Sequence, residues 1–264
     1  MRCIFCKQDS STSQSVEHII PESLGNIDHI LPVGTVCDRC NNYMAREVEK
    51  PLLDSFYFKE RRFYAGLTNK KKRIPTIEGV HLQSLTRIEL MKTPCESQIS
   101  IGAASTVDEA RWVNSILNKQ SGSLIIPIGS KPDDYVVSRF IAKVGLEVLA
   151  HRAINVPRGL EEVVDKPELD ELRRYVRRGS SGSTWPYSYR RIYLPDTMFN
   201  NGNEQYEVLH EFDILITDQG EFYIVVALFG DEYALNLGGP EMDGYYRWIE
   251  MNNNNSPLYS WKNA

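Results

Sequence analysis

Two Cys-x-x-Cys pairs near the start of the chain constrain its fold more than any other sequence feature. The first pair is Cys3 and Cys6, the second is Cys37 and Cys40, and thirty residues separate them. A two-residue spacer lets neighbouring thiolates bind one metal ion, and two such pairs supply the four ligands of a tetrahedral zinc. We therefore expect one structural zinc on these four cysteines.

Cysteine usage and apolar patterning also indicate a compartment. Cys95 is the one cysteine outside the two pairs. Paired cysteines of this kind suit metal-bound thiolates in a reducing cytoplasm better than a disulfide framework. The longest apolar runs, such as residues 222–229, are too short to span a bilayer, and no signal-like apolar stretch follows Met1. We expect a cytoplasmic protein that does not contact a membrane.

The pattern of apolar and turn-forming residues predicts an α+β chain with two domains. We expect a small zinc-stapled domain over residues 1–68 and a larger mixed α+β domain over residues 74–264, with a basic boundary between them. The larger domain should contain a buried strand at 124–128, its longest helix at 132–154 and a hairpin around 218–220. The small domain has little apolar area to bury, so zinc should supply much of its stability.

A candidate reactive site lies between the two cysteine pairs. Glu17 and His18 occupy a short predicted strand that Pro21 ends. An imidazole can take a proton from water near neutral pH. Phosphodiester cleavage also needs a divalent cation on hard oxygen ligands, which the Glu17 carboxylate and the amide carbonyls of Asn41 and Asn42 can supply. Because neighbouring strand residues point oppositely, Glu17 and His18 can face two sides of one phosphate.

In combination these motifs resemble the HNH endonucleases, in particular those with a four-cysteine zinc around a ββα-metal finger. The resemblance covers about the first 55 residues, and it rests on Cys3-x-x-Cys6, Glu17-His18-Ile-Ile-Pro21, Ser23-Leu24-Gly25-Asn26 and Cys37-x-x-Cys40-Asn41-Asn42. It implies a structural Zn²⁺ on the four cysteines and His18 as the general base. It also implies a catalytic Mg²⁺ or other divalent ion on Glu17 and Asn41, with Asn42 as the alternative ligand.

The sequence departs from the family pattern at one position. The middle Asn of the motif has no match, because Pro32 stands in its place. Asn26 or His29 can stand in for it, or the backbone is held in another way. We find no such resemblance beyond residue 73.

Basic residues concentrate near the expected domain boundary. The net charge of the chain is −5, yet residues 1–73 hold twelve Lys and Arg against nine Asp and Glu, so the remainder carries −8. A local basic stripe can bind a phosphate backbone, and a solvated linker is the alternative. The candidate nucleic-acid contacts are Lys59, Arg61, Arg62, Lys70, Lys71, Lys72 and Arg73.

Three other clusters lie in the larger domain. Lys143, Glu147 and His151 follow one another at four-residue spacing, which predicts a salt-bridged, solvated helix stripe. The second cluster is a basic helix edge, which can pair internally or contact DNA: Arg173, Arg174, Arg177 and Arg178. The third is aromatic and can stack on bases or pack a sheet face: Trp185, Tyr187 and Tyr189.

Taken together, the sequence predicts a metal-dependent HNH-type endonuclease that hydrolyses phosphodiester bonds of DNA. The larger domain is a candidate for target recognition, for homodimerisation, or for binding an activating ligand or partner protein. Restriction or anti-phage defence is a candidate biological role. The alternative function is a non-catalytic zinc module that binds nucleic acid or protein, with Glu17 and His18 purely structural.

Overall fold

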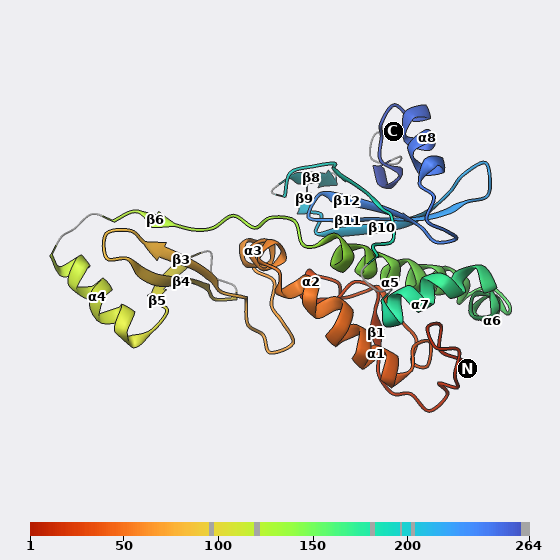
Figure 1. Cartoon of the computed structure of the whole chain (residues 1–264), viewed down its shortest axis with the longest axis horizontal. Coiled ribbons are helices and arrows are strands. Elements are labelled where there is room, and N and C mark those ends of the chain that lie inside the picture. The colour runs from red at the N-terminus through yellow and green to blue at the C-terminus, as the bar shows by residue number, and fades with distance from the viewer. Residues whose placement is uncertain (95–97, 119–121, 180–182, 196, 202–203, 260–264) are drawn as a thin grey trace. The chain divides into compact units, whose positions relative to one another are not determined.

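The computed structural model describes residues 1–94, 98–118, 122–179, 183–195, 197–201 and 204–259, and the chain forms two compact units. One unit is discontinuous and joins Met1–Leu52 to Asp133–Ala264, and the other is an inserted unit formed by Leu53–Pro132. Figure 1 shows helices and strands in both units, so the predicted α+β class is confirmed. We call Met1–Leu52 the head.

The boundaries of the two units differ from those of the predicted ranges, 1–68 and 74–264. In the inserted unit, Phe63 packs against Ile74, Ile77, Ile88 and Leu90, so the segment after Leu52 shares a core with the sheet that follows it. The head instead packs against elements that follow Asp133. The basic run 69–73 is a turn within the inserted unit, in which the Asn69 and Arg73 backbones are hydrogen-bonded.

The head has the strand–strand–helix order of a ββα finger. Strand β1 (Glu17–His18) pairs antiparallel with β2 (Ile30–Leu31), and a 3₁₀ turn, η1 (Glu22–Leu24), lies in the loop between them. Helix α1 (Asp38–Met44) begins after Cys37, whose sulfur accepts a hydrogen bond from the Cys40 amide. A π-helical turn, η2 (Ala45–Glu49), and α2 (Lys50–Asp54) continue from it.

Helix α5 (Asp134–Ala153) is the central element of the discontinuous unit (Figure 1). It contacts β2 and η2 of the head, the C-terminal sheet, and helices α6 (Gly159–Asp165) and α7 (Asp170–Arg178). Most of its residues are buried, as expected for a helix that is covered on several sides. Its cap is Asp133, whose side chain accepts from the Tyr135 amide.

An antiparallel sheet completes the discontinuous unit in the order β10 (His210–Ile216), β11 (Phe222–Leu228), β12 (Asp231–Asn236) and β7 (Ser188–Arg191). The predicted hairpin joins β10 to β11, with Gly220 at a positive φ of 76°. Tyr223 and Val225 pack with residues of α8 (Asp243–Met251). A separate hairpin pairs β8 (Met198–Asn201) with β9 (Glu204–Glu207), and short 3₁₀ turns are η3 (Pro167–Leu169) and η4 (Pro257–Tyr259).

The inserted unit contains a second antiparallel sheet, with helices α3 (Phe56–Tyr64) and α4 (Thr106–Leu117). Its strand order is β5 (Ile99–Ala103), β4 (Thr86–Lys92), β3 (Ile77–His81) and β6 (Leu124–Ile125). The predicted buried strand at 124–128 is wrong in length and burial, since β6 has two residues and both are exposed. Within the described residues, no helix is long and apolar enough to cross a membrane.

Candidate active site

The four cysteines of the two pairs converge in the head. Their sulfurs all lie within 4.8 Å of one another, none forms a disulfide, and the Cys6 and Cys37 sulfurs are 3.7 Å apart. Zinc–sulfur bonds of about 2.3 Å in a tetrahedron place sulfurs about 3.8 Å apart, so these thiols fit a zinc ion. The hydrogen bond between Cys3 and Cys40 lowers the pKa of Cys3 and raises the pKa of Cys40, so Cys3 is the member of this pair that becomes a thiolate first. In the described part of the chain, this is the one candidate metal cluster of His, Cys, Asp and Glu side chains.

Asn26 holds the loop that follows strand β1. Its buried amide nitrogen donates to the carbonyls of Ile20 (2.7 Å) and His29 (2.9 Å), and its amide oxygen accepts from the His29 backbone N–H (2.9 Å). Of the two residues that could replace the missing motif Asn, Asn26 therefore makes the backbone contacts. The His29 ring instead packs edge-on against Phe212, with ring centroids 4.8 Å apart.

His18 lies on β1 and is partly exposed. Its carbonyl accepts a hydrogen bond from Lys143 Nζ at 3.1 Å, which fixes the backbone at this position. Its Nδ1 atom is buried and has no hydrogen-bond partner among the described residues. The imidazole is thus on a fixed strand, and its Nδ1 is not held by a hydrogen bond to any described group.

Glu17 points the other way and forms a buried ion pair. Its Oε1 lies 2.8 Å from Lys143 Nζ, and the same ammonium contacts Glu49 Oε1 at 2.7 Å and Glu147 Oε2 at 2.9 Å. Burial raises the pKa of Glu17. Burial disfavours the Lys143 ammonium, yet the attraction of Glu147, Glu17 and Glu49 is stronger and raises the pKa of Lys143 well above its usual range. We call these four residues the Lys143 cluster.

The Lys143 cluster corrects one prediction. Lys143 and Glu147 are fully buried, not part of a solvated stripe, because the face of α5 that carries them packs against the head. His151, the third member of that stripe, is partly exposed.

The two candidate amide ligands are not arranged alike. Asn41 Nδ2 donates to the carbonyl of Val16 at 3.0 Å and so attaches α1 to the chain just before β1. The Asn42 side chain is exposed. Because the Glu17 carboxylate is already bound to an ammonium, Glu17, Asn41 and Asn42 do not fit a divalent ion in this arrangement.

The predicted nucleic-acid contacts lie in the inserted unit, and they differ in exposure. Arg61 stacks over the Tyr57 ring at 3.4 Å. Arg62 is buried, and burial lowers its pKa while its guanidinium donates to the Leu53 carbonyl at 3.4 Å, so its contacts are internal. Lys59 is partly exposed, and the exposed members are Lys70, Lys71, Lys72 and Arg73.

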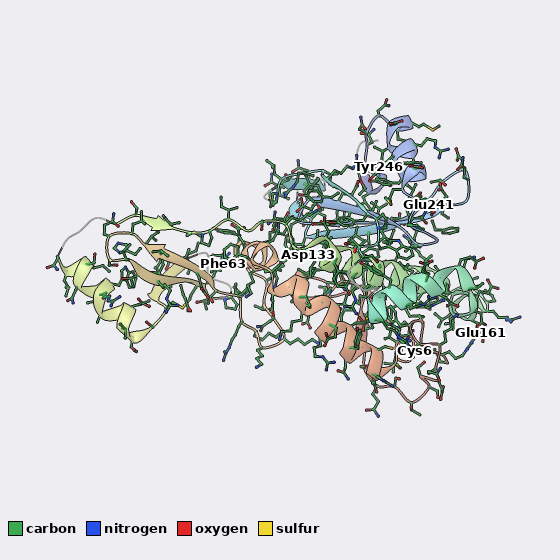
Figure 2. The ribbon with its side chains drawn as sticks, in the orientation of Figure 1. Cys6, Phe63, Asp133, Glu161, Glu241 and Tyr246 are labelled. Atoms are coloured by element: carbon green, nitrogen blue, oxygen red, sulfur yellow. The ribbon has the colours of Figure 1, made fainter. Side chains whose placement is uncertain are left out.

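Helix α7 carries the basic edge, and its first arginine is structural. Arg173 is buried and donates to the carbonyl of Ile4 at 2.8 Å, which attaches α7 to the first cysteine loop. Lys7, which follows Cys6 (labelled in Figure 2), pairs with Asp170 at 2.5 Å. Exposed side chains on this edge are Arg174 and Arg178.

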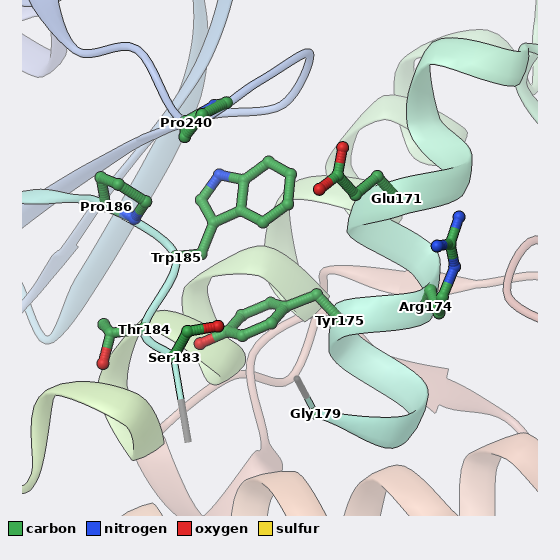
Figure 3. A pocket seen from close by; sticks show the side chains of 9 residues that line it. All are labelled: Glu171, Arg174, Tyr175, Gly179, Ser183, Thr184, Trp185, Pro186 and Pro240. Atoms are coloured by element: carbon green, nitrogen blue, oxygen red, sulfur yellow. The ribbon is translucent and has the colours of Figure 1, made fainter. Parts of the chain in front are cut away.

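A small cavity of about 280 Å³ lies between α7 and the segment before β7. Figure 3 shows Trp185 and Tyr175 in its wall, with Glu171 and Arg174 on the α7 side. Trp185 is buried, and its indole N–H donates to the Asn236 carbonyl at 3.0 Å. Trp185 therefore packs inside the protein, which is the alternative to stacking on bases.

The comparison with protein families agrees with this geometry. Residues 3–57 match the family model described as HNH endonuclease. This range confirms the resemblance of the first 55 or so residues, and it contains the four cysteines, β1, β2 and α1. No curated protein and no solved structure matches the chain. The N-terminal segment is thus an HNH endonuclease-family domain with a candidate zinc site.

Proposed function

We propose that this chain is an HNH-type endonuclease that hydrolyses phosphodiester bonds of DNA. One observation carries the proposal: within the segment that matches the HNH endonuclease model, His18 lies on a strand flanked by the Asn26 loop and the four-cysteine cluster. Zinc on Cys3, Cys6, Cys37 and Cys40 would hold the finger together. Defence against foreign DNA is the biological setting in which we would test the activity.

His18 acts as the general base in this proposal. Its imidazole takes a proton from a water molecule, which then attacks the scissile phosphorus in line with the leaving oxygen. Cleavage leaves a 3′-hydroxyl and a 5′-phosphate. The exposed residues Lys70, Lys71, Lys72 and Arg73 are proposed to contact the DNA backbone, because phosphate binding needs accessible cations.

A divalent ion on Glu17 and Asn41 or Asn42, which the family resemblance implies, would supply charge stabilisation at the phosphate. In the arrangement described above, the Glu17 carboxylate is bound to Lys143 instead. Binding an ion at Glu17 would require this ion pair to separate.

Plasmid nicking tests the proposed activity. The full chain, loaded with zinc, is incubated with supercoiled DNA and Mg²⁺ or Mn²⁺, alongside His18→Ala and a matched control, His151→Ala, which removes another partly exposed imidazole. We expect nicking by the wild type and by the control, and none by His18→Ala at unchanged zinc content. Equal nicking by His18→Ala would remove His18 from the mechanism.

A non-catalytic zinc module is the second candidate. The Lys143–Glu17 ion pair favours it, because this pair occupies the carboxylate on which metal chemistry would depend. Binding of DNA by wild type and His18→Ala alike, with no nicking by either, is the result that this candidate predicts.

A further inference from the structure

The Lys143 cluster holds one cation, the Lys143 ammonium, among several oxygen atoms. Three carboxylates contact one point of positive charge at 2.7–2.9 Å, and the His18 carbonyl lies 3.1 Å from the same nitrogen. Carboxylate and carbonyl oxygens are also the ligands that divalent ions such as Mg²⁺ and Mn²⁺ prefer. An ammonium and a metal ion therefore compete for the same oxygen of Glu17.

We propose that the Lys143 ammonium is the resident cation of Glu17 and excludes divalent ions from this carboxylate while α5 packs against the head. The effect of this exclusion on DNA cleavage rests on the proposed function. The head would be held in a state that cannot bind an ion at Glu17. Lys143 is then an internal inhibitor supplied by the helix that follows the inserted unit.

Burial makes this exclusion strong. The Lys143 and Glu147 side chains have no exposed surface, and that of Glu17 is 6% exposed. Mg²⁺ usually keeps several of its water ligands, and such a hydrated ion needs space and access. An ion that displaced Lys143 would also leave an ammonium without a partner in the protein interior, which is strongly unfavourable.

Further contacts between α5 and the head accompany the Lys143–Glu17 ion pair. Besides Lys143, Arg139 of α5 donates to the Glu47 carbonyl at 3.2 Å and to the Tyr43 hydroxyl at 2.6 Å. Pro51, four residues after Glu47, has no N–H to donate to this carbonyl. Arg139 and Lys143 lie one turn apart on α5, so a shift of α5 that took Lys143 from Glu17 would also break these contacts.

Direct measurement of Mn²⁺ binding tests the proposal. Free Mn²⁺ is followed by electron paramagnetic resonance in titrations of the zinc-loaded full chain. Lys143→Met should bind one Mn²⁺ at least tenfold more tightly than the wild type, and Lys143→Met/Glu17→Gln should lose that gain. Arg152→Met is the matched control, because it removes a cation of α5 that pairs with Asp213 of β10 and not with Glu17, and it should bind Mn²⁺ as the wild type does.

Two outcomes overturn the proposal: equal Mn²⁺ affinity of wild type and Lys143→Met, or a wild-type Mn²⁺ site that Glu17→Gln abolishes. The second comparison does not need Lys143→Met to fold. If Lys143→Met loses zinc or unfolds, Lys143→Met/Glu147→Gln takes its place, because it leaves one buried charge fewer.

Nicking assays on the same proteins separate this proposal from the proposed function. Tight, Glu17-dependent Mn²⁺ binding by Lys143→Met without DNA cleavage supports the resident cation and contradicts the nuclease. The opposite result is that the wild type nicks DNA while Lys143→Met shows neither faster nicking nor tighter Mn²⁺ binding. This result supports the nuclease and overturns the resident cation.

Discussion

Lys143 of helix α5 lies 2.8 Å from the Glu17 carboxylate of strand β1, although the whole inserted unit separates the two residues in sequence. The pair joins the first and last parts of the discontinuous unit through a buried charge. It also places Glu17, the proposed carboxylate ligand of a catalytic ion, against the positively charged Lys143. The stability of the head therefore depends on α5 and, in our proposal, so does ion binding at Glu17.

Removal of the Lys143 ammonium should destabilise the protein strongly. Lys143→Met leaves the carboxylates of the cluster without their cation, and breaking a buried pair in this way costs about 3–5 kcal/mol. Met at both Lys143 and Glu147 should cost less than Lys143→Met alone, because the fully buried carboxylate is removed as well. Urea unfolding measures both values. A double variant that is less stable than the single one would contradict this account.

Loss of zinc should unfold the head. Cys37→Ser removes one of the four converging sulfurs, and metal binding supplies much of the folding free energy of small zinc domains. We expect a zinc content near zero by mass spectrometry and a lowered melting temperature, with the same effect from a strong chelator. Cys95→Ser is the matched control and should retain the metal. Full zinc occupancy in Cys37→Ser would rule out the four-sulfur site.

Asn26→Ala should destabilise the loop after β1 by about 2–4 kcal/mol, because it leaves buried backbone groups of Ile20 and His29 without partners. Asn26→Asp keeps the acceptor for the His29 N–H and loses both donated bonds, so its cost should be comparable. Asn255→Ala, at an exposed asparagine, should be neutral within about 0.5 kcal/mol. Denaturant midpoints compare the three variants, and a neutral Asn26→Ala would show that the loop does not need this amide.

Stability should fall as the pH drops from 7 to 5. Burial, with a smaller contribution from the charge of His29, lowers the pKa of His210 to about 4. The unfolded chain, with an ordinary His pKa near 6.5, binds the proton first between these values, so acid favours unfolding by about 2 kcal/mol at pH 5. His210→Gln should flatten this part of the profile in thermal melts at several pH values. An unchanged slope in the variant would assign the effect to another group.

The local features of the head could be predicted from sequence. The Cys-x-x-Cys spacing brings two sulfurs together within one turn of chain. The zinc site can therefore be predicted without knowledge of the larger domain. The strand at Glu17 and His18 and its end before Pro21 likewise follow from neighbouring residues. The HNH resemblance rests on the same short-range motifs, and the family match covers the same stretch.

The Lys143 cluster could not be predicted in this way. A Lys and a Glu four residues apart read the same on a solvated helix face and on a buried one. Their partner Glu17 lies before the inserted unit, and no local pattern pairs the two segments. One sequence signal does indicate that Lys143 is buried. Most of its neighbours in α5 are apolar, as expected for a helix that is covered on several sides.

The compact units differ from the predicted domain ranges for a related reason. The run from Asn69 to Arg73 has the polar composition of a linker, yet the Asn69 side chain accepts from the Lys71 and Arg73 amides, so the run is an ordered turn. A charged turn and a charged linker have the same composition.

The discontinuous unit also determines how this protein can be cut and recombined. A clone that stops at residue 68 would carry Glu17 and Glu49 without Lys143, so it would lack the helix that buries them. Replacing residues 53–132 with a short tether would instead keep both halves of the unit in one polypeptide. Exchange of the inserted unit between proteins, with the finger and α5 kept together, is therefore the form of modularity that this architecture permits.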